Sequence, residues 1–360
     1  YFKSIGNDLV AKKSNINSDK YETLDFALIQ IKNAKIPSYI KYISPNCFKC
    51  CDQLTKIEFQ KDSNLRRIGN CSFEELSIEE ITIPSHVKYI KKLLLNCDNL
   101  KNVDFGANSE LKVIGKDSFN SESIECISIP KNVTKIKDGL CPFAPNLINV
   151  KISQENKNFK IINEKLLIGK SNPKYEKFDV LLLAFRDIEK VIIPSYIRYI
   201  SSYCFKDCQK IKTIEFAANS ELVSIGKYAF SDSSIEHISI PENCERIDKF
   251  CFNNTYKLIK VEFPLHSKIE IIPSNTFCCS YIKDITFPSS VSMLQKESFY
   301  KCENLKNVRF LRNFICIHTN SFKECSNLMV LEFPNAKKIH YHKEAFEDQS
   351  NIQILLKNNI

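Results

Sequence analysis

Apolar and polar residues alternate in two stretches near the start of the chain, Phe2 to Ala11 and Thr23 to Ile31. A polar segment, Ser14 to Lys20, separates them. Alternation with a period of two on both sides of a polar segment predicts a β-hairpin with a long loop. The same pattern returns between Phe159 and Ile193, and Phe159 lies 157 residues after Phe2. The chain therefore contains a duplication, and each copy begins with a predicted hairpin.

A second pattern fills the rest of the chain. Ile193 to Phe216 (IPSYIRYISSYCFKDCQKIKTIEF) repeats Ile36 to Phe59 (IPSYIKYISPNCFKCCDQLTKIEF) almost letter for letter. Units of 22 to 24 residues share an apolar residue, a second one three residues later, a Phe five residues further on, and then a strand of the form L-x-x-I-x-I/F. Twelve regular units and two enlarged ones, which carry the hairpins, account for the chain. This length is typical of leucine-rich-repeat coils.

Prolines divide the units into pairs. They follow the apolar strand ending at Pro37, Pro84, Pro130, Pro194, Pro241, Pro288 and Pro334, with spacings of 47, 46, 64, 47, 47 and 46 residues. The long interval contains the second hairpin. Proline has no N–H group, so it fits where a strand ends and no hydrogen-bond donor is needed.

A unit of about 23 residues cannot bury its own apolar face, so the units must stack. We expect a leucine-rich-repeat solenoid of right-handed coils, with a parallel β-sheet on the concave face, short turns or short helical or 3-10 segments on the return, and two β-hairpin insertions. Residues 1–157 form the first array and residues 158–360 the second, in one continuous solenoid. Gly69, Gly115 and Gly226 are expected to be structural. The repeated Phe is expected to point into the core at Phe48, Phe73, Phe119, Phe205, Phe230, Phe252, Phe277, Phe299 and Phe322.

The repeat resembles the BspA-like class of leucine-rich repeat, I-P-x-x-V-x-x-I-x-x-x-x-F-x-x-C-x-x-L-x-x-I-x-F. Two units match best: Pro194-Ile197-Ile200-Phe205-Cys208-Ile211-Ile214-Phe216 and Pro288-Val291-Leu294-Phe299-Cys302-Leu305-Val308-Phe310. The resemblance covers nearly the whole chain, the hairpins included. Members of this family are largely surface or secreted proteins of oral bacteria and parasitic protists, and adhesion to host proteins and cells is the usual proposal for them. The resemblance implies a non-enzymatic protein-binding module.

Composition narrows the range of partners. The net charge is +9, but Lys and Arg alternate with Asp and Glu along the whole chain, which is typical of a solvated surface and does not favour nucleic acid. The longest apolar run, Val180 to Ala184, has the length of a strand, so no transmembrane segment is expected. Because the chain begins with Tyr1 and shows no signal-peptide pattern, we expect it to be a trimmed or partial chain.

Sixteen cysteines raise the question of disulfides and metals. A buried free Cys behaves as a small hydrophobe, so we interpret the commonest position as part of the core. No second Cys pair or His matches Cys47, Cys50 and Cys51, and therefore no metal site is expected. The sequence leaves open whether disulfides join consecutive coils. The spacing between the cysteines allows such bonds, but side chains that point in parallel do not favour them. The commonest position lies three residues before the strand pattern, at Cys51, Cys97, Cys208, Cys279, Cys302 and Cys325.

A small basic cluster near the C-terminus contains His340 and His342 with Lys337, Lys338 and Lys343. Two His at i and i+2 of a strand share a face, which is compatible with part of a metal site. We prefer to interpret the cluster as the polar face of a terminal coil, because the end coils of a solenoid must face water.

No local signature of catalysis is present. The chain has no Ser/His/Asp or Cys/His arrangement in a known motif and no Gly-rich phosphate loop, so neither an enzyme nor a cofactor is expected. Three N-glycosylation motifs begin at Asn70, Asn132 and Asn253, a number expected by chance in a chain rich in Asn and Ser.

A row of polar residues marks the candidate binding face. Within L-x-x-I-x-F, the residue between the last two apolar positions points away from the core, because strand side chains alternate. The simplest explanation is charge spacing that keeps a sheet soluble; our hypothesis is a protein-binding surface. The predicted site residues are Glu58, Asp104, Lys151, Glu215, Glu262, Arg309 and Glu332, with Lys56 and Lys260 two positions earlier.

Two functions remain open. The first is a cell-surface or secreted adhesin-like module that binds a protein partner through the solenoid. The second is an intracellular scaffold, or a component of a larger assembly, that uses the same repeats. The exposed strands of the two hairpins also predict lateral self-association, because unpaired strand edges can pair with another chain.

Overall fold

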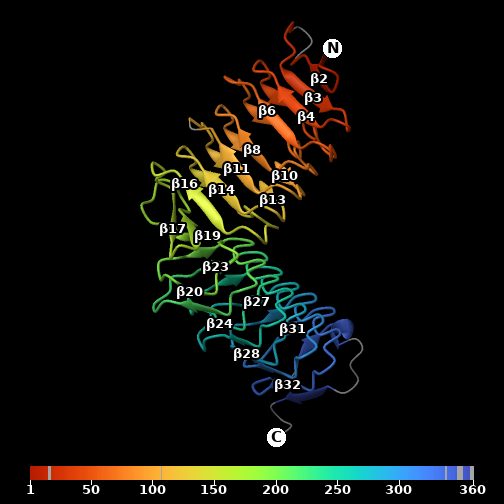
Figure 1. The fold of residues 1–360 in the computed structure, drawn as a ribbon. Helices are drawn as coiled ribbons and strands as arrows, with labels where there is room; N and C mark the ends of the chain where they lie inside the picture. The colour runs from red at the N-terminus through yellow and green to blue at the C-terminus, as the bar shows by residue number, and fades with distance from the viewer. Residues whose placement is uncertain (15–17, 107, 337–338, 347–351, 357–360) are drawn as a thin grey trace. The chain divides into compact units, whose positions relative to one another are not determined.

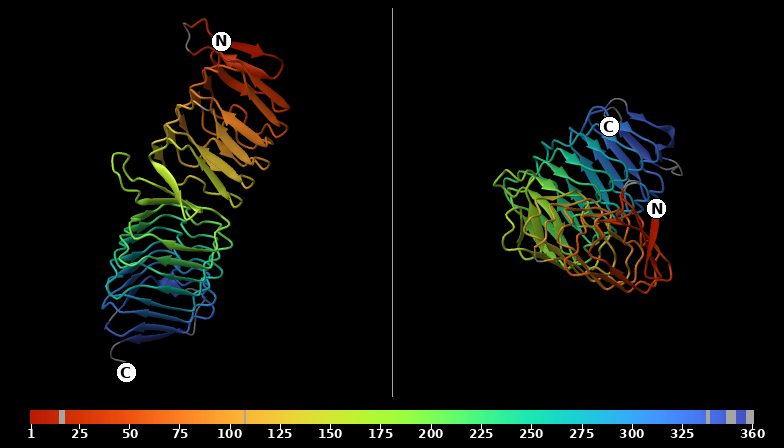
Figure 2. Two further views of the ribbon diagram at one scale, coloured as in Figure 1. Left: turned by 60° about the vertical axis from the view of Figure 1, so that its left-hand side comes forward. Right: turned by 90° about the horizontal axis from the view of Figure 1, so that it is seen from above.

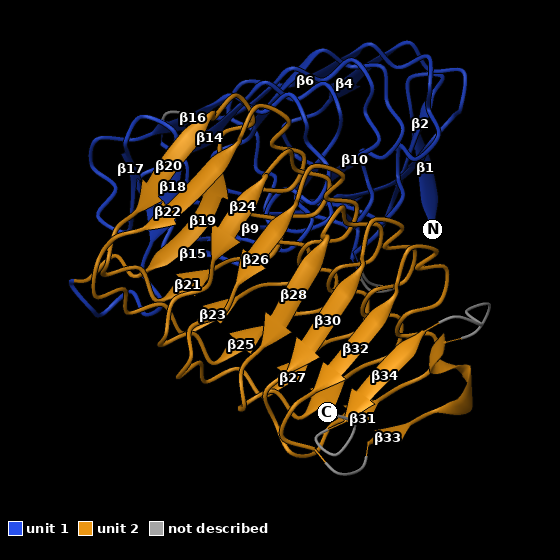
Figure 3. Cartoon of the chain, turned by 90° about the horizontal axis from the view of Figure 1, so that it is seen from below, with its two compact units in different colours: residues 1–176 blue, residues 177–360 orange. Residues whose placement is uncertain are grey.

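The computed structural model describes residues 1–14, 18–106, 108–336, 339–346 and 352–356 (Figure 1). It divides into two compact units, residues 1–176 and residues 177–360, shown in different colours in Figure 3. Each unit is a stack of coils. A typical coil contributes one long and one short β-strand, and both kinds pair with the matching strand of a neighbouring coil.

Unit 1 begins with an antiparallel meander rather than a simple hairpin. Strand β2 (Leu9–Lys12) pairs with both β1 (Phe2–Ile5) and β3 (Thr23–Ala27). The hairpin across the polar segment is therefore confirmed, between β2 and β3. The stretch Phe2 to Ala11 is two strands, since Gly6 turns the chain between them with a φ of 61°.

The long strands of unit 1 run parallel and lie side by side (Figure 1). Their apolar side chains alternate into the core, as the sequence pattern predicts. These strands are β4 (Asn33–Ile36), β6 (Lys56–Phe59), β8 (Glu80–Ile83), β11 (Asn102–Phe105), β14 (Cys126–Ile129) and β16 (Asn149–Ile152). An antiparallel hairpin of β17 (Phe159–Ile162) and β18 (Leu166–Gly169) follows them.

Unit 2 has the same organisation, and Figure 3 shows its long strands running in one direction. The stacking of its coils is seen best in the left view of Figure 2. The unit begins with β19 (Val180–Ala184). Its long strands are β20 (Lys190–Ile193), β22 (Thr213–Phe216), β24 (His237–Ser239), β26 (Lys260–Glu262), β28 (Asp284–Phe287), β30 (Asn307–Phe310), β32 (Val330–Phe333) and β34 (Gln353–Leu356).

A second set of parallel pairings, absent from the sequence-based prediction, runs along the return of the coils. In unit 1 it is made by β5 (Tyr42–Ile43), β7 (Arg67–Ile68), β9 (Tyr89–Ile90), β12 (Val113–Ile114) and β15 (Lys135–Ile136), with β10 (Leu94–Leu95) pairing β13 (Phe119–Asn120). In unit 2 it is made by β21 (Tyr199–Ile200), β23 (Ser224–Ile225), β25 (Arg246–Ile247), β27 (Ile271–Ile272), β29 (Met293–Leu294), β31 (Cys316–Ile317) and β33 (His340–Tyr341). A single helical segment, the 3-10 helix η1 (Lys343–Phe346), occurs among the described residues.

The repeated Phe forms the core ladder in each unit. All nine predicted Phe side chains are less than 2% exposed, so their inward orientation is confirmed. Consecutive rings stack: the centroids of Phe230 and Phe252 are 5.1 Å apart, and those of Phe252 and Phe277 are 5.4 Å apart. Contacts of this kind add to the free energy gained from burying the rings.

The backbone around each Phe makes a further ladder of hydrogen bonds. Residues two positions before and after it commonly adopt positive φ, such as Tyr203 (63°) and Asp207 (60°) on either side of Phe205. Because positive φ at these residues changes the direction of the backbone, the N–H groups around the Phe point toward the next coil. The Phe205 N–H donates to the Ala229 carbonyl oxygen at 2.7 Å, and the Phe252 N–H donates to the Thr276 carbonyl oxygen at 2.8 Å.

Close approach between coils explains the predicted glycines. A Cβ atom on Gly226 would lie 2.5 Å from the Ser202 nitrogen, and one on Gly115 would lie 2.6 Å from the Ile90 oxygen. Such distances leave no room for a methyl group, so the structural role of these residues is confirmed.

A proline after a long strand removes one hydrogen-bond donor from the ladder to the preceding strand. In coils without proline after the strand, the next N–H closes the ladder, as when Ala217 donates to the Ile193 oxygen at 3.0 Å. Strands β20 and β22 therefore match over four residues. Pro241 follows β24 and has no N–H to offer the Phe216 carbonyl, and β22 and β24 match at one position only, Thr213 with His237.

Closely matched and poorly matched interfaces both occur elsewhere in the two units. Four matched positions join β4 to β6, β8 to β11, β14 to β16 and β28 to β30. Strand β14, which precedes Pro130, matches β11 at only two positions. Strands β8 and β28, which precede Pro84 and Pro288, lie in different sheets from β6 and β26. These weak interfaces separate the long strands into twos as far as β28. Proline does not always open the sheet, because Pro264 follows β26 and Pro334 follows β32, and yet β24–β26 and β30–β32 each match at three positions.

Candidate functional site

The predicted site residues lie on the outer face of the long-strand sheets. Glu58, Asp104 and Lys151 are exposed on strands of unit 1, and Glu215, Glu262 and Arg309 are exposed on strands of unit 2, whereas Glu332 is half-buried. This is the orientation expected from strand alternation. Their role in binding stays a prediction.

Most of these charges are paired within the face. Lys56 Nζ lies 2.5 Å from Glu58 Oε1, and Lys260 Nζ lies 2.5 Å from Glu262 Oε1. Hydrogen bonds from these lysines lower the pKa of both glutamates, and the hydroxyl of Ser239 also donates to Glu262. Ion pairs this exposed contribute little to stability, but they neutralise the surface locally.

Two further contacts extend the pairing between coils. Arg309 Nη1 lies 3.3 Å from Glu332 Oε2 on the adjacent strand. Asp104 accepts a hydrogen bond of 2.7 Å from the hydroxyl of Ser128, which stands opposite Lys151 in the strand register. The face therefore carries acidic, basic and hydroxyl side chains that contact one another, and it is not uniformly acidic.

Glu215 differs from the other glutamates of the row. Glu58 and Glu262 each have a lysine two residues earlier, but Thr213 occupies that position before Glu215. Among the described residues, no cationic side chain lies within ion-pair distance of the Glu215 carboxylate. Glu215 is exposed on β22 and free to interact with a partner.

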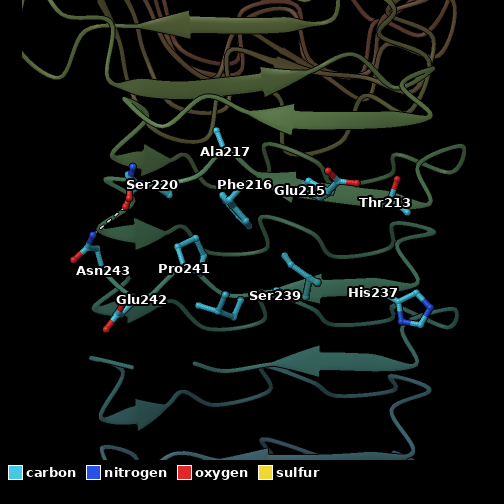
Figure 4. A pocket seen from close by; sticks show the side chains of 14 residues that line it. Thr213, Glu215, Phe216, Ala217, Ser220, His237, Ser239, Pro241, Glu242 and Asn243 are labelled. Carbon is cyan, nitrogen blue, oxygen red and sulfur yellow. Dashed lines mark hydrogen bonds between the residues drawn. The ribbon is translucent and has the colours of Figure 1, made fainter. Parts of the chain in front are cut away.

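A hollow of about 630 Å³ opens beside Glu215, where β22 and β24 part. Figure 4 shows Glu215 and Thr213 toward one end of it, Glu242 and Asn243 toward the other, and Phe216 and Pro241 between them. Phe216 is half-buried here, whereas the matching Phe310 is fully buried. No Lys or Arg lines this hollow.

Unit 1 has a hollow at the matching place. It measures about 1110 Å³ and includes Phe59 and Pro84, which precede Phe216 and Pro241 by 157 residues. It too lies where a strand before proline leaves its neighbour, between β6 and β8. Its lining differs because it contains Lys56 and Lys101 beside its acidic residues.

The cysteines behave as core residues. All sixteen are free thiols. Cys97 donates to the Phe73 oxygen at 3.1 Å, and Cys325 donates to the Phe299 oxygen at 2.9 Å. Burial raises the pKa of Cys97 to about 12, so this thiol is a poor nucleophile.

One cysteine assignment was wrong. The position three residues after Phe277 is Ser280, because that unit is one residue shorter before its strand. Ser280 is buried and lies 3.5 Å from the sulfur of Cys302. Cys279 instead occupies the half-exposed position with a φ of 58°.

The C-terminal histidines do not converge on a metal. Within the described residues, no group of three or more His, Cys, Asp or Glu side chains is placed to hold a metal ion. The ring of His340 packs against Phe314, and His342 Nδ1 lies 3.9 Å from Glu344 Oε2. Lys337 and Lys338, the other predicted members, lie outside the described residues. In the described part of the chain, no helix has the length and apolarity needed to cross a membrane.

Comparison with known families decides the classification. The family model described as "BspA type Leucine rich repeat region (6 copies)" matches residues 22–163, 183–277 and 270–360. The chain belongs to the BspA-type leucine-rich repeat family. The matched ranges of this BspA-type protein include every predicted site residue. A search of curated proteins finds no sequence match.

Solved structures share the fold of this BspA-type protein. The pneumococcal vaccine antigen PcpA is similar with a TM-score of 0.67 and 21% identity, over 90% of this chain and 74% of PcpA. A leucine-rich cell surface protein from Faecalibacterium prausnitzii has a TM-score of 0.61 and 18% identity, over 94% and 92%. A leucine-rich repeat protein from Eubacterium ventriosum has a TM-score of 0.66 and 22% identity, over 90% and 78%. At these identities the likeness shows the fold alone.

The hollows were not predicted from the sequence of this BspA-type protein, although two signals for them were present. One was the proline after the strand at each hollow, Pro84 in unit 1 and Pro241 in unit 2. The other was Thr213, which replaces the lysine found before Glu58 and Glu262. The first signal indicates where the sheet opens, and the second indicates which glutamate remains unpaired.

Proposed function

We propose that this BspA-type protein is a non-enzymatic binding module at the cell surface or in the secreted fraction, and that it recognises a protein partner through the outer face of its long strands. The observation that carries the proposal is this face itself: each unit presents a row of polar side chains, and a hollow with a half-buried Phe opens in each row. Aromatic residues framed by polar groups are typical of protein-binding surfaces.

The comparisons support the location and the class of function. Two of the similar structures are titled as a pneumococcal vaccine antigen and as a leucine-rich cell surface protein. The sequence motifs supply no catalytic group. Adhesion to a host protein follows as the finer proposal, because an extended repeat surface suits a macromolecular partner.

Binding to an array of purified extracellular host proteins tests this function. We expect saturable binding to at least one of them, reduced at least tenfold by the double variant Glu215→Lys, Glu262→Lys. The matched control is Glu245→Lys, Glu270→Lys, which makes the same change in charge at two exposed positions outside the long strands. Absence of saturable binding to every protein in the array would contradict the proposed function.

A second function, an intracellular scaffold, is favoured by the cysteines. Sixteen free thiols, most of them buried as core residues, suit a reducing compartment. Thiol trapping in cells, followed by mass spectrometry of the Asn70, Asn132 and Asn253 peptides, distinguishes the two. Glycans on these peptides support the surface module, whereas sixteen trapped thiols without glycans support the scaffold.

A further inference from the structure

The hollow beside Glu215 differs in its lining from the matching hollow of unit 1. In a chain with a net charge of +9, its lining contains Glu215, Glu242 and His237 and neither Lys nor Arg. In the described residues, no cationic side chain pairs with either carboxylate. Two uncharged donors on its walls are engaged: Asn243 Nδ2 donates to the Ser220 oxygen at 3.0 Å, and the Ser239 hydroxyl donates to Glu262.

The backbone adds a third acceptor. Pro241 cannot donate to the Phe216 carbonyl, and the strand pairing between β22 and β24 has ended before this point. An open carbonyl, two carboxylates and the half-buried ring of Phe216 thus border one hollow. Guanidinium or ammonium groups complement these acceptors, because they form charge-assisted hydrogen bonds with carboxylate and carbonyl oxygens.

The arrangement of the acceptors indicates an extended ligand. Glu215 lies on β22, whereas Glu242 lies in the turn that follows β24 and Pro241, at the other end of the hollow. Figure 4 shows Phe216 and Pro241 between these two residues. In an extended peptide, side chains at i and i+4 point the same way about 13 Å apart, and the side chain at i+2 lies between them.

We propose that this hollow binds an extended segment of a partner protein with the pattern basic-x-apolar-x-basic. The two basic side chains pair with Glu215 and Glu242, and the apolar one contacts Phe216 and Pro241. The proposal rests on the proposed binding function and specifies the partner segment that unit 2 recognises. The matching hollow of unit 1 does not share this specificity, because Lys56 neutralises Glu58 and also lines the hollow.

Titration of the full chain with a fluorescent Arg-Ser-Val-Ser-Arg peptide tests the proposal. We expect saturable binding that weakens at least tenfold when citrulline, a neutral isostere, replaces both arginines. Glu215→Gln and Glu242→Gln should each weaken binding roughly tenfold, and binding should weaken as salt is added. Glu245→Gln, an exposed glutamate outside the hollow, is the matched control for folding and charge.

Equal affinity for the arginine and citrulline peptides would overturn the proposal, as would no saturable binding of the arginine peptide. Unchanged affinity in both hollow variants would also overturn it, because the peptide would then bind elsewhere. The host-protein array tests the proposed function separately from this peptide site. If the array still shows binding that is sensitive to Glu215→Lys, Glu262→Lys, the protein binds a partner whose chemistry differs from the basic peptide.

Discussion

Individual Phe residues carry much of the stability of each coil. Phe252 is fully buried and stacks between Phe230 and Phe277. A truncated ring would leave a cavity that stacked neighbours on both sides cannot fill, because each is fixed by its own coil.

Phe252→Ala should lower the free energy of unfolding by about 3–5 kcal/mol. Chemical denaturation followed by far-UV circular dichroism measures the change. Leu265→Ala is the control, since Leu265 is 67% exposed and its truncation should change stability by less than about 0.5 kcal/mol. A loss below about 1 kcal/mol for Phe252→Ala would mean that the ladder relaxes around the gap.

Asp232 is a residue whose contribution depends on pH. Burial by itself raises its pKa, but hydrogen bonds from Ser231 at 2.6 Å, Lys206 at 2.9 Å and Asn254 at 3.0 Å outweigh burial and lower the pKa below its ordinary value. A lowered pKa in the folded state means that the stabilisation is fully present above the unfolded pKa of about 4. It is lost as the pH falls through the folded value.

Asp232→Asn should therefore destabilise the protein by about 1 kcal/mol at pH 7, and by progressively less below about pH 4. Urea unfolding at pH 7 and at pH 3 measures both effects. Asp52→Asn, a change at an exposed carboxylate, should have little effect at either pH. A loss in Asp232→Asn that is the same at both pH values would show that shape rather than charge matters at this position.

At the scale of elements, the proline after β24 removes the donor that would extend the pairing of β24 with β22. Pro241→Ala supplies the N–H that the Phe216 carbonyl lacks. We expect β22 and β24 to pair further along in this variant. The new amide at position 241 should then exchange slowly with solvent, as we also expect of the Ala217 amide, which donates to the Ile193 oxygen.

Hydrogen exchange measured on peptides that span position 241 checks this expectation. Peptides around Ala217 provide the internal reference within the same spectra. Fast exchange of the new amide would indicate that the side chains of the hollow, and not the missing donor, hold the strands apart.

For the molecule as a whole, the second hairpin is the place where we predict self-association. Tyr175 is 59% exposed in the segment that follows β18. Deletion of Ser171 to Asp179 should reduce association in sedimentation velocity runs over a range of concentrations. Tyr175→Ser, which keeps the segment, should reduce it in part. An unchanged association in both variants would remove this hairpin as the contact.

The sequence was sufficient for the solenoid because its period repeats many times, so that errors in single units cancel. The backbone conformation of the turns could not be predicted from the sequence. Positive φ occurs at Tyr203, Cys279 and Glu297 alike, residues with no shared local preference for that conformation. Stacking on the neighbouring coil imposes it. The same holds for the short strands, which are two residues long at Tyr42–Ile43 and gain their pairing only from the coil beside them.

The paired arrangement of coils also has a mechanical consequence. From β4 to β16 and from β20 to β28, long strands are joined firmly in twos and loosely between the twos. A pulling force along a unit would meet its weakest links at these places and detach two coils together. Pro194 and Pro241 are 47 residues apart, so each such event would release about 160 Å of extended chain. A molecule bound to a partner under fluid flow would therefore unfold in steps of this length, and the chain would extend before the molecule dissociates from its partner.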